Sequence, residues 1–311
     1  MKIDSCLILS AGFGTRMGPI GKILPKPLWP LFERKILELQ IKFAQTLGIK
    51  KIYVNVHHCH AHMSQFIDIY NQNNSIKINL LHEPNLLGSG GGVHNLASYE
   101  KYTGVLLYLA GDQFYFFDQV YFELAKDLIS SHGAVLFGLK VNKSDFYNRL
   151  IIENNILKKI NGPESSSLIT FSGMGLINLE KLKPTPGVSS FFDSVANFKE
   201  KKIYIVTPDN SEYWDFGTSE KYLNSCFTLL QGKESRFLEF CKREKVLDFP
   251  KLFKNSNSYG SKESKNLINL SKKRVENLEN HKAIILDFQG DFLKVEFPGL
   301  YFNEISERVL C

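Results

Sequence analysis

Apolar runs that suit β-strands alternate with stretches of helical periodicity along the first 141 residues, and this alternation constrains the fold most. The expected strands are residues 2–9, 51–56, 76–81, 104–109 and 134–141, and the expected helices are residues 34–47, 61–71, 90–96 and 118–130. Apolar strands that alternate with helices form a sheet that is covered on both faces. We therefore expect a Rossmann-like α/β fold: a mostly parallel sheet sandwiched by helices, with a ligand crevice at the carboxyl ends of its strands.

The pattern changes after residue 145. Segments at 150–153, 156–160 and 168–177 predict a small β-rich insertion, followed by a helix at 191–199 and a strand at 202–206. Residues 254–273 are rich in Ser, Asn and Lys, which is typical of a flexible linker. Two later runs, 283–288 and 292–297, predict a β-hairpin around Gln289-Gly290-Asp291, and no internal repeat is evident. The expected domains are a main domain at 1–232, closing helices at 233–253, a linker at 254–274 and a C-terminal β-hairpin appendix at 275–311.

Composition indicates a globular protein without a membrane segment. Of the 311 residues, 43% are hydrophobic and 23% are charged, and no apolar run is long enough to cross a bilayer. The N-terminus does not read as a signal peptide, and five scattered cysteines suit free thiols in a reducing compartment, so we expect a cytoplasmic protein. The net charge of +6 suits anionic substrates but is too small to indicate nucleic-acid binding.

The most informative stretch begins where the first expected strand ends. It reads Leu9-Ser10-Ala11-Gly12-Phe13-Gly14-Thr15-Arg16-Met17, followed by Leu24-Pro25-Lys26-Pro27-Leu28. Backbone amides of a small-residue loop can hold phosphate oxygens, and Arg16 supplies further donors for the same group. Lys26 is a second cation in a segment that two prolines stiffen. Two cations directed at one point suit a phosphoryl group whose charge must be neutralised in the transition state.

Two common phosphate-binding motifs do not fit this stretch. A dinucleotide fingerprint needs a glycine three residues after Gly14, where Met17 stands. A Walker loop needs Gly-Lys-Ser or Gly-Lys-Thr after the second glycine, and this triplet is absent. The remaining alternative is a surface turn with an incidental Arg and Lys, but the order of strand, turn and both cations favours a phosphate site.

Gly12, Gly14, Thr15 and Arg16, followed after eight residues by Pro25-Lys26-Pro27, resemble the signature of the sugar-phosphate nucleotidyltransferases. Three further family motifs recur in order within residues 1–230. They are Glu83-Pro84-Asn85-Leu86-Leu87-Gly88-Ser89-Gly90-Gly91-Gly92, Leu109-Ala110-Gly111-Asp112 and Trp214-Asp215-Phe216-Gly217-Thr218. The resemblance implies a nucleotidyltransferase catalytic domain with the GT-A-like fold, which joins a nucleoside triphosphate to a sugar 1-phosphate and releases pyrophosphate.

The resemblance also implies the roles of individual residues. Mg²⁺ would bridge Asp112, Asp215 and the triphosphate, as suits a hard cation. Arg16 would steady the leaving pyrophosphate, and Lys26 would bind phosphate at the reacting centre. The nucleotide would contact Leu9, Ala11, Gly12, Gly14, Thr15, Glu83, Gly88 and Gly90, with the base stacked on the backbone of the glycine-rich loop. Thr218 would cap the following helix.

The family pattern breaks where the sugar phosphate should bind. Many members carry Glu-Lys-Pro after the mid-chain hairpin, but this chain has Lys159-Ile160-Asn161-Gly162-Pro163-Glu164. The candidate sugar-phosphate residues are Asn148, Ser172 and Gly173, and Lys158 or Lys159 could replace the family lysine. Thr170-Phe171-Ser172-Gly173 resembles the N-acetylmuramate-1-phosphate uridylyltransferase branch, which serves the cell envelope, so UTP is favoured.

Other interpretations stay open. Leu87-Gly88-Ser89 is also common in mannose- and heptose-1-phosphate guanylyltransferases, and Arg16-Met17-Gly18 resembles cytidylyltransferases. A catalytically inactive nucleotide-binding regulator is the alternative from a different class. His57-His58-Cys59-His60-Ala61-His62 has spacing that could bind zinc, although an ordinary strand-to-helix loop is the simpler interpretation. The sequence leaves the oligomeric state open.

Overall fold

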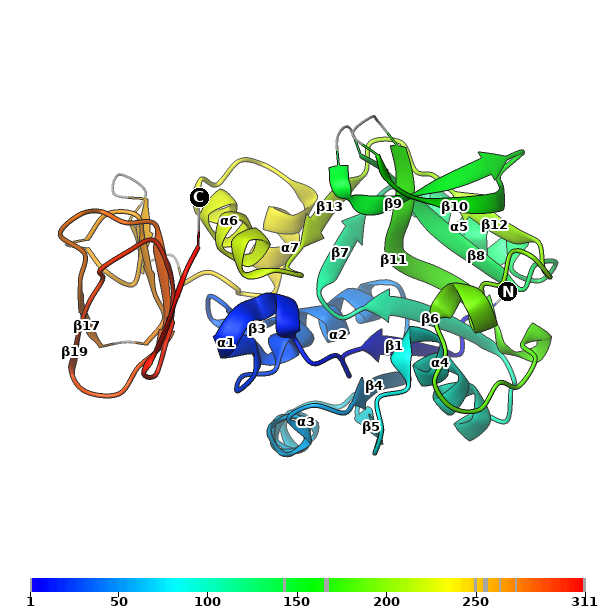
Figure 1. Ribbon diagram of the computed structural model, residues 1–311, viewed down its shortest axis with the longest axis horizontal. Helices are drawn as coiled ribbons and strands as arrows, with labels where there is room; N and C mark the ends of the chain where they lie inside the picture. Colours follow the sequence, from blue (N-terminus) through cyan, green and yellow to red (C-terminus); the bar gives the residue numbers. More distant parts are fainter. Residues whose placement is uncertain are drawn as a thin grey trace. The chain divides into compact units, whose positions relative to one another are not determined.

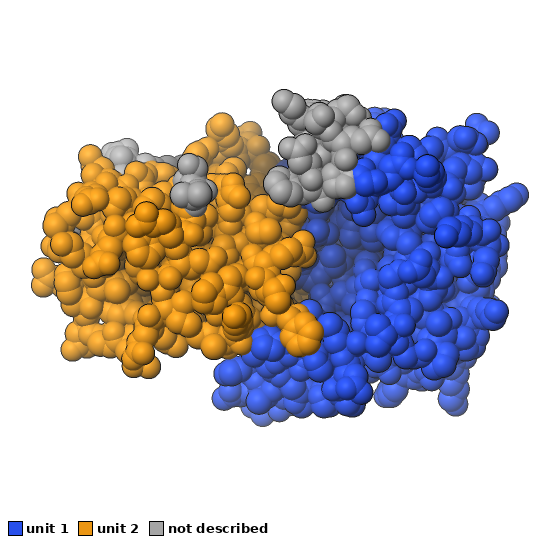
Figure 2. Space-filling view, viewed as in Figure 1, with its two compact units in different colours: residues 1–12, 43–213 blue, residues 13–42, 214–311 orange. Residues whose placement is uncertain are grey.

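The chain folds into two compact units. The computed structural model describes residues 2–141, 144–164, 168–248, 251–253, 257–262, 264–271 and 273–309. Unit 1 comprises residues 1–12 and 43–213, and unit 2 comprises residues 13–42 and 214–311 (Figure 2). The chain passes between the units after Gly12, within helix α2 (Ile36–Thr46) and within strand β13 (Glu212–Asp215).

Unit 1 is built on a nine-stranded mixed sheet of order β5-β4-β1-β6-β11-β8-β12-β10-β9 (Figure 1). The strands are β1 (Ser5–Leu9), β4 (Ile52–Val56), β5 (Ile78–His82), β6 (Val105–Ala110), β8 (Ala134–Val141), β9 (Ser144–Glu153), β10 (Ile156–Glu164), β11 (Leu168–Asn178) and β12 (Ile203–Val206). Strands β5, β4, β1 and β6 are parallel, as are β8 and β12. The other neighbouring pairs run antiparallel.

The parallel half of the sheet follows the alternation in the sequence. Helix α3 (His60–Asn73) follows β4, α4 (Gly88–Tyr99) follows β5, and α5 (Gln119–Leu128) follows the short strand β7 (Gln113–Phe116). All five residues of β4 are buried, which fits a strand covered on both faces. The α/β prediction is therefore confirmed. The helix expected at 191–199 is instead a single π-helical turn, Phe191–Val195, which packs in the main core with Val93 and Leu106.

Unit 2 is made of two segments of the chain, one that follows β1 and one that begins within β13. Its elements are η1 (Thr15–Met17), α1 (Gly18–Gly21), η2 (Lys26–Leu28), β2 (Pro30–Leu31), β3 (Arg34–Lys35), α6 (Ser219–Leu230) and α7 (Arg236–Arg243). The Trp29 and Tyr222 rings lie 5.0 Å apart edge to face, and Trp214 and Phe216 both contact Phe237. This aromatic cluster buries the segment after Lys26 against α6 and α7.

The C-terminal part of unit 2 is a small parallel β-solenoid. Its first sheet contains β14 (Leu252–Phe253), β15 (Ser258–Tyr259), β16 (Leu267–Asn269), β18 (Ala283–Asp287), β20 (Gly299–Phe302) and β21 (Ile305–Arg308), and its second contains β17 (Arg274–Glu276) and β19 (Phe292–Lys294). Leu267 pairs with Ala283 and Ala283 pairs with Gly299, so one turn of the solenoid takes 16 residues. We call the described residues of 258–308 the C-terminal solenoid.

The solenoid corrects two expectations. The run at 283–288 pairs in parallel with β16 and β20, whereas the run at 292–297 contributes β19 to the other sheet, so the expected hairpin does not form. The segment expected to be a linker contains β15 and β16. The sixteen-residue spacing is a structural repeat without a repeated sequence motif. Short strands suffice because Leu267, Ile285 and Tyr301 share a core with Val295.

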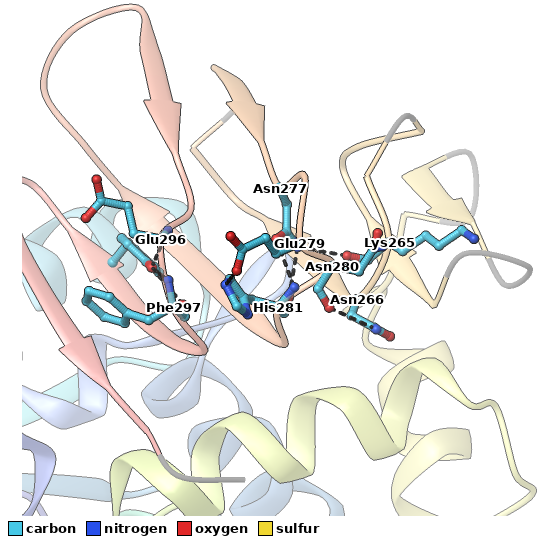
Figure 3. A network of polar contacts seen from close by, with 9 residues as sticks. Lys265, Asn266, Asn277, Glu279, Asn280, His281, Glu296 and Phe297 are labelled. Carbon is cyan, nitrogen blue, oxygen red and sulfur yellow. Dashed lines mark hydrogen bonds and ion pairs between the residues drawn. The ribbon is translucent and has the colours of Figure 1, made fainter.

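Asparagine side chains hold the turns between the solenoid strands (Figure 3). The Asn277 Nδ2 donates to the carbonyls of Lys265 at 2.9 Å and His281 at 2.8 Å, and its Oδ1 accepts from the His281 amide at 2.9 Å. Asn277 is buried, so each of these bonds replaces water that the turn excludes. The polar residues that suggested a linker therefore fix the backbone of the turns.

No helix in the described ranges is both long and apolar enough to span a membrane. Among the described residues, Cys6, Cys59, Cys226 and Cys241 form no disulfide bond.

We predict that Asn277→Ala lowers the free energy of unfolding of unit 2 by about 2–3 kcal/mol, because it leaves buried backbone groups without partners. Both tryptophans of the chain, Trp29 and Trp214, lie in unit 2, so urea unfolding followed by tryptophan fluorescence reports the loss. The matched control is Glu279→Gln at an exposed position of the same turn. Equal midpoints for the two variants would contradict the role given to Asn277.

Candidate active site

Buried hydrogen bonds join the carboxyl ends of three parallel strands in unit 1. The Ser10 amide, after β1, donates to Asn55 Oδ1 on β4 at 2.8 Å. Asn55 Nδ2 donates to Glu83 Oε1, after β5, at 2.7 Å. Glu83 Oε2 accepts from the Leu87 amide at 3.1 Å, just before α4. Asn55 and Glu83 are both nearly inaccessible to solvent. Buried hydrogen bonds through these two side chains therefore hold the loop after β1 to the loop after β5.

The turn that carries Asp112 joins this edge of the sheet. The Gly111 amide donates to the Leu9 carbonyl at 3.1 Å. A Cβ added to Gly111 would lie 2.4 Å from that carbonyl oxygen, so only glycine allows this approach. Asp112 follows directly and is 8% exposed. The structure thus brings together Leu9, Ala11, Gly12, Glu83 and Asp112, which the sequence predicted from three separate motifs.

The glycines of α4 face protein backbone. The amides of Gly90 and Gly91 donate to the Ser189 carbonyl at 2.9 and 3.2 Å. A Cβ on Gly90 would meet the Ser190 carbonyl oxygen at 2.3 Å, and one on Gly88 would meet the Ser189 oxygen at 2.8 Å. Each interior glycine costs a helix about 1 kcal/mol relative to alanine. Close packing of the segment 187–194 explains why glycine is required at position 90, and the expected stacking of a base on this loop stays a prediction.

In unit 2, Arg16 lies on a short turn with glycine on either side. Gly14 and Gly18 have φ angles of +64° and +60°, which favour glycine. The Met17 amide donates to the Gly14 carbonyl at 2.8 Å, and Met17 is fully buried. Thr15 and Arg16 between them are exposed. The buried Met17 therefore anchors a turn that presents the Arg16 guanidinium to solvent.

Lys26 and Asp215 also belong to unit 2. Lys26 begins the turn η2, and its carbonyl accepts from the Trp29 amide at 3.0 Å. Asp215 Oδ1 accepts from the Gly217 amide at 2.7 Å, and Asp215 Oδ2 lies 2.6 Å from Lys221 Nζ. Its side chain is only 9% exposed, so this ion pair is largely shielded from solvent. Thr218 caps α6 as expected, since its side chain accepts from the Lys221 amide.

The two candidate metal ligands belong to different units. Asp112 lies in unit 1, and Asp215 lies in unit 2, where Lys221 neutralises it. Carboxylate oxygens fit Mg²⁺ chemically, and this ion commonly takes only one or two protein acids. Within the described ranges, no three His, Cys, Asp or Glu side chains gather as a metal site. The described residues of the histidine-rich loop after β4 form no such group either. The His57 Nδ1 donates to the Glu83 carbonyl at 2.8 Å, and the His60 and His82 rings lie 4.1 Å apart.

The candidate sugar-phosphate residues occupy a bulge and a strand of the insertion. The Ser172 hydroxyl is buried and donates to the Phe137 carbonyl at 2.8 Å. Gly173 has a φ of +79°, within the irregularity between Phe171 and Gly175. Ser172 and Gly173 thus shape the strand, while Asn148 and the lysines Lys158 and Lys159 are exposed. Glu164 has no described side chain.

Sequence reasoning assigned no role to Asn55 or Lys221, whose contacts hold the candidate site residues. A polar residue inside the otherwise apolar strand 52–56 was a signal for Asn55, because a buried amide needs partners. Lys221 lies six residues after Asp215, and only the entry into α6 brings the two side chains together.

We predict that Gly90→Ala destabilises unit 1 by about 1–3 kcal/mol, because its new methyl group overlaps the Ser190 carbonyl. Gly12→Ala is the matched control, since a Cβ there meets nothing within 4 Å among the atoms of the protein. Urea unfolding followed by far-UV circular dichroism measures both. A Gly90→Ala variant as stable as Gly12→Ala would contradict the packing explanation.

Comparison with known proteins shows which proteins this chain is similar to. Residues 5–147 match the family described as nucleotidyl transferase. The chain is 29% identical over 119 residues to UTP–glucose-1-phosphate uridylyltransferase of Synechocystis sp., which covers 34% of this chain and 30% of that protein. It is 27% identical over 151 residues to D-glycero-alpha-D-manno-heptose 1-phosphate guanylyltransferase of Campylobacter jejuni, covering 49% of this chain and 64% of that protein. The matches thus span less than two thirds of each relative's length.

Solved structures share the fold. HddC from Yersinia pseudotuberculosis, complexed with GMP-PN, superposes with a TM-score of 0.60 at 19% identity, over 73% of this chain and 99% of that chain. A UDP-glucose pyrophosphorylase complexed with UDP-glucose gives a TM-score of 0.59 at 15% identity, over 75% of this chain and all of that one (100%). Residues 5–147 therefore match the nucleotidyl transferase family, and the chain is similar to proteins named as sugar-1-phosphate nucleotidyltransferases.

Proposed function

We propose that this protein transfers a nucleotidyl group from a nucleoside triphosphate to a sugar 1-phosphate, forming a nucleotide sugar and pyrophosphate. The observation that carries the proposal is the hydrogen-bonded set of strand ends in unit 1. There the Ser10 amide, Asn55 and Glu83 hold the start of the Gly-x-Gly-Thr-Arg signature against the motif that begins at Glu83. Names of the curated relatives support the same reaction class.

In the proposed reaction, a phosphate oxygen of the sugar 1-phosphate attacks the α-phosphorus. A new oxygen–phosphorus bond forms there as the bond to the β-phosphate oxygen breaks, and pyrophosphate leaves. The sugar phosphate is already ionised near neutral pH, so no protein nucleophile is required. Arg16, which is exposed on its turn, would stabilise the charge that develops on pyrophosphate, and Lys26 would bind the phosphate at the reacting centre.

Mg²⁺ is the cofactor we propose. Asp112 and Asp215 would hold it, together with phosphate oxygens, and the bound ion would neutralise charge on the triphosphate. A bound ion would compete with the ammonium of Lys221 for Asp215 Oδ2. Lys221 is 33% exposed in its side chain, so it has solvent on one side to move into.

UTP is the triphosphate that the Thr170-Phe171-Ser172-Gly173 segment favours, with an N-acetylmuramate-type sugar and a role in the cell envelope. GTP is the second candidate, because two relatives are named as guanylyltransferases of mannose and heptose 1-phosphates. We place the reaction in the cytoplasm, where nucleotide and sugar phosphates are available. The proposed partners are these small molecules, without nucleic acid or membrane.

The experiment that tests this function is a grid of UTP, GTP, CTP, ATP and dTTP against a panel of sugar 1-phosphates, read as pyrophosphate release. We expect release only when Mg²⁺ and a sugar 1-phosphate are both present, and the fastest release with UTP. Fastest release with GTP would contradict the choice of base but not the reaction. A protein that binds nucleotide but releases no pyrophosphate anywhere in the grid would contradict the enzyme and favour the inactive regulator.

We expect Asp112→Asn to lower kcat by about a hundredfold or more, because a neutral amide holds a divalent cation poorly. Its thermal unfolding should remain close to that of the unaltered protein. Asp127→Asn, at an exposed position of α5, is the matched control and should keep full turnover. Near-normal turnover in Asp112→Asn would rule out its place at the metal.

A further inference from the structure

Glu307 on β21 places its carboxyl group directly against the Arg16 turn. A Cβ built on Gly18 would lie 2.2 Å from Glu307 Oε2 and 2.4 Å from Oε1, so the carboxyl group occupies the space beside the Gly18 backbone. Gly18 is the first residue of α1 and comes two residues after Arg16. Strand β21 and helix α1 both belong to unit 2.

The environment of this carboxyl group is unusual for a glutamate. Its Oε2 is buried and forms no hydrogen bond with any described residue. Burial raises the pKa of Glu307, and the nearby Ser219 hydroxyl opposes that shift. A buried carboxyl oxygen without a partner costs free energy, so its retention needs an explanation beyond the stability of the solenoid.

Glu307 also lies beside the start of α6. Ser219 is the first residue of that helix and is 5% exposed, four residues after Asp215. A second contact ties the solenoid to the same helix: Lys282 Nζ donates to Asn224 Oδ1 at 2.6 Å and lies 5.3 Å from the centre of the Phe227 ring. The solenoid thus contacts both segments of unit 2 that carry candidate active-site residues.

The Arg16 turn needs such support because its own helices are too short to be stable. The turn consists of η1 with three residues and α1 with four, and isolated helices of this length do not persist in water. Met17 and Ile20 are fully buried and hold one side of the turn. Gly18 lies on the side that Glu307 covers.

We infer that Glu307 is a positioning residue, through which the C-terminal solenoid holds the Arg16 turn in place. The role rests on the proposed function in so far as Arg16 acts on the leaving pyrophosphate. The packing of Glu307 on Gly18 is a separate claim about the structure. Glu307 acts by filling space beside the turn, so a neutral side chain of the same shape should replace it.

The first test is hydrogen–deuterium exchange on the full-length protein. The Met17 and Leu24 amides donate to the Gly14 and Ile20 carbonyls and report the order of the turn. In Glu307→Ala we expect amides of residues 14–24 to exchange about tenfold faster, while the amides of β18 keep their protection. Glu307→Gln should restore the protection. Glu304→Gln, exposed in the turn before β21, is the control and should change nothing.

Three outcomes of this test would overturn the inference. One is exchange of residues 14–24 at the unaltered rate in Glu307→Ala. Another is loss of protection throughout unit 2, which would mean that Glu307 supports folding and not the turn in particular. The third is equal loss in Glu307→Gln and Glu307→Ala, which would show that the charge matters and the shape does not.

The second test separates this inference from the proposed function. In the pyrophosphate assay, we expect Glu307→Ala to lower kcat about tenfold with less than about a twofold change in KM for the sugar 1-phosphate. A raised KM with unchanged kcat would overturn the positioning role. If the unaltered protein shows no transfer at all, the proposed function fails, while the exchange data still decide whether Glu307 holds the turn.

Discussion

The hydrogen bonds from Ser10 through Asn55 to Glu83 are the interaction on which the candidate site depends. Parallel strands end at one edge of a sheet, but their loops are free to diverge unless something joins them. Asn55 joins two of them because its amide group accepts from one loop and donates to the other. Burial makes these bonds costly to break, since each lost partner would leave a polar group without water. The loops that carry Ser10 and Glu83 are therefore held to one another by bonds within the protein.

The candidate residues of unit 2 are held in place by a different kind of contact. Arg16 and Lys26 lie on short turns of unit 2, and Asp215 is the last residue of the four-residue strand β13. Aromatic packing around Tyr222 and Phe237 supports the turns after Lys26 and Asp215, and the C-terminal solenoid supports the turn of Arg16. The candidate residues of unit 2 thus lie on small elements that larger elements hold in place. The solenoid, which the sequence left without a role, becomes part of this support.

The sequence predicted those elements whose pattern lies within one short stretch of residues. It did not predict features that depend on contacts between distant parts of the chain. Strands such as 52–56 and 134–141 were predicted closely because a continuous apolar run needs burial on both faces. The solenoid was missed because its strands are two to five residues long, and because β16, β18 and β20 recur every 16 residues without a shared motif. The site motifs were recognised by order and spacing, whereas the packing role of Gly90 and the Lys221 ion pair depend on tertiary contacts that a single sequence does not contain.

The central claim is that one protein joins two phosphorylated substrates. Phosphorus NMR of the full-length protein with UTP, Mg²⁺ and the sugar 1-phosphate most active in pyrophosphate release tests it most directly, because every product carries phosphorus. The account predicts that the sugar phosphate signal disappears as the coupled pair of a nucleotide sugar diphosphate and the signal of pyrophosphate grow in equal amounts. Formation of nucleoside monophosphate and pyrophosphate while the sugar phosphate stays unconsumed would contradict it.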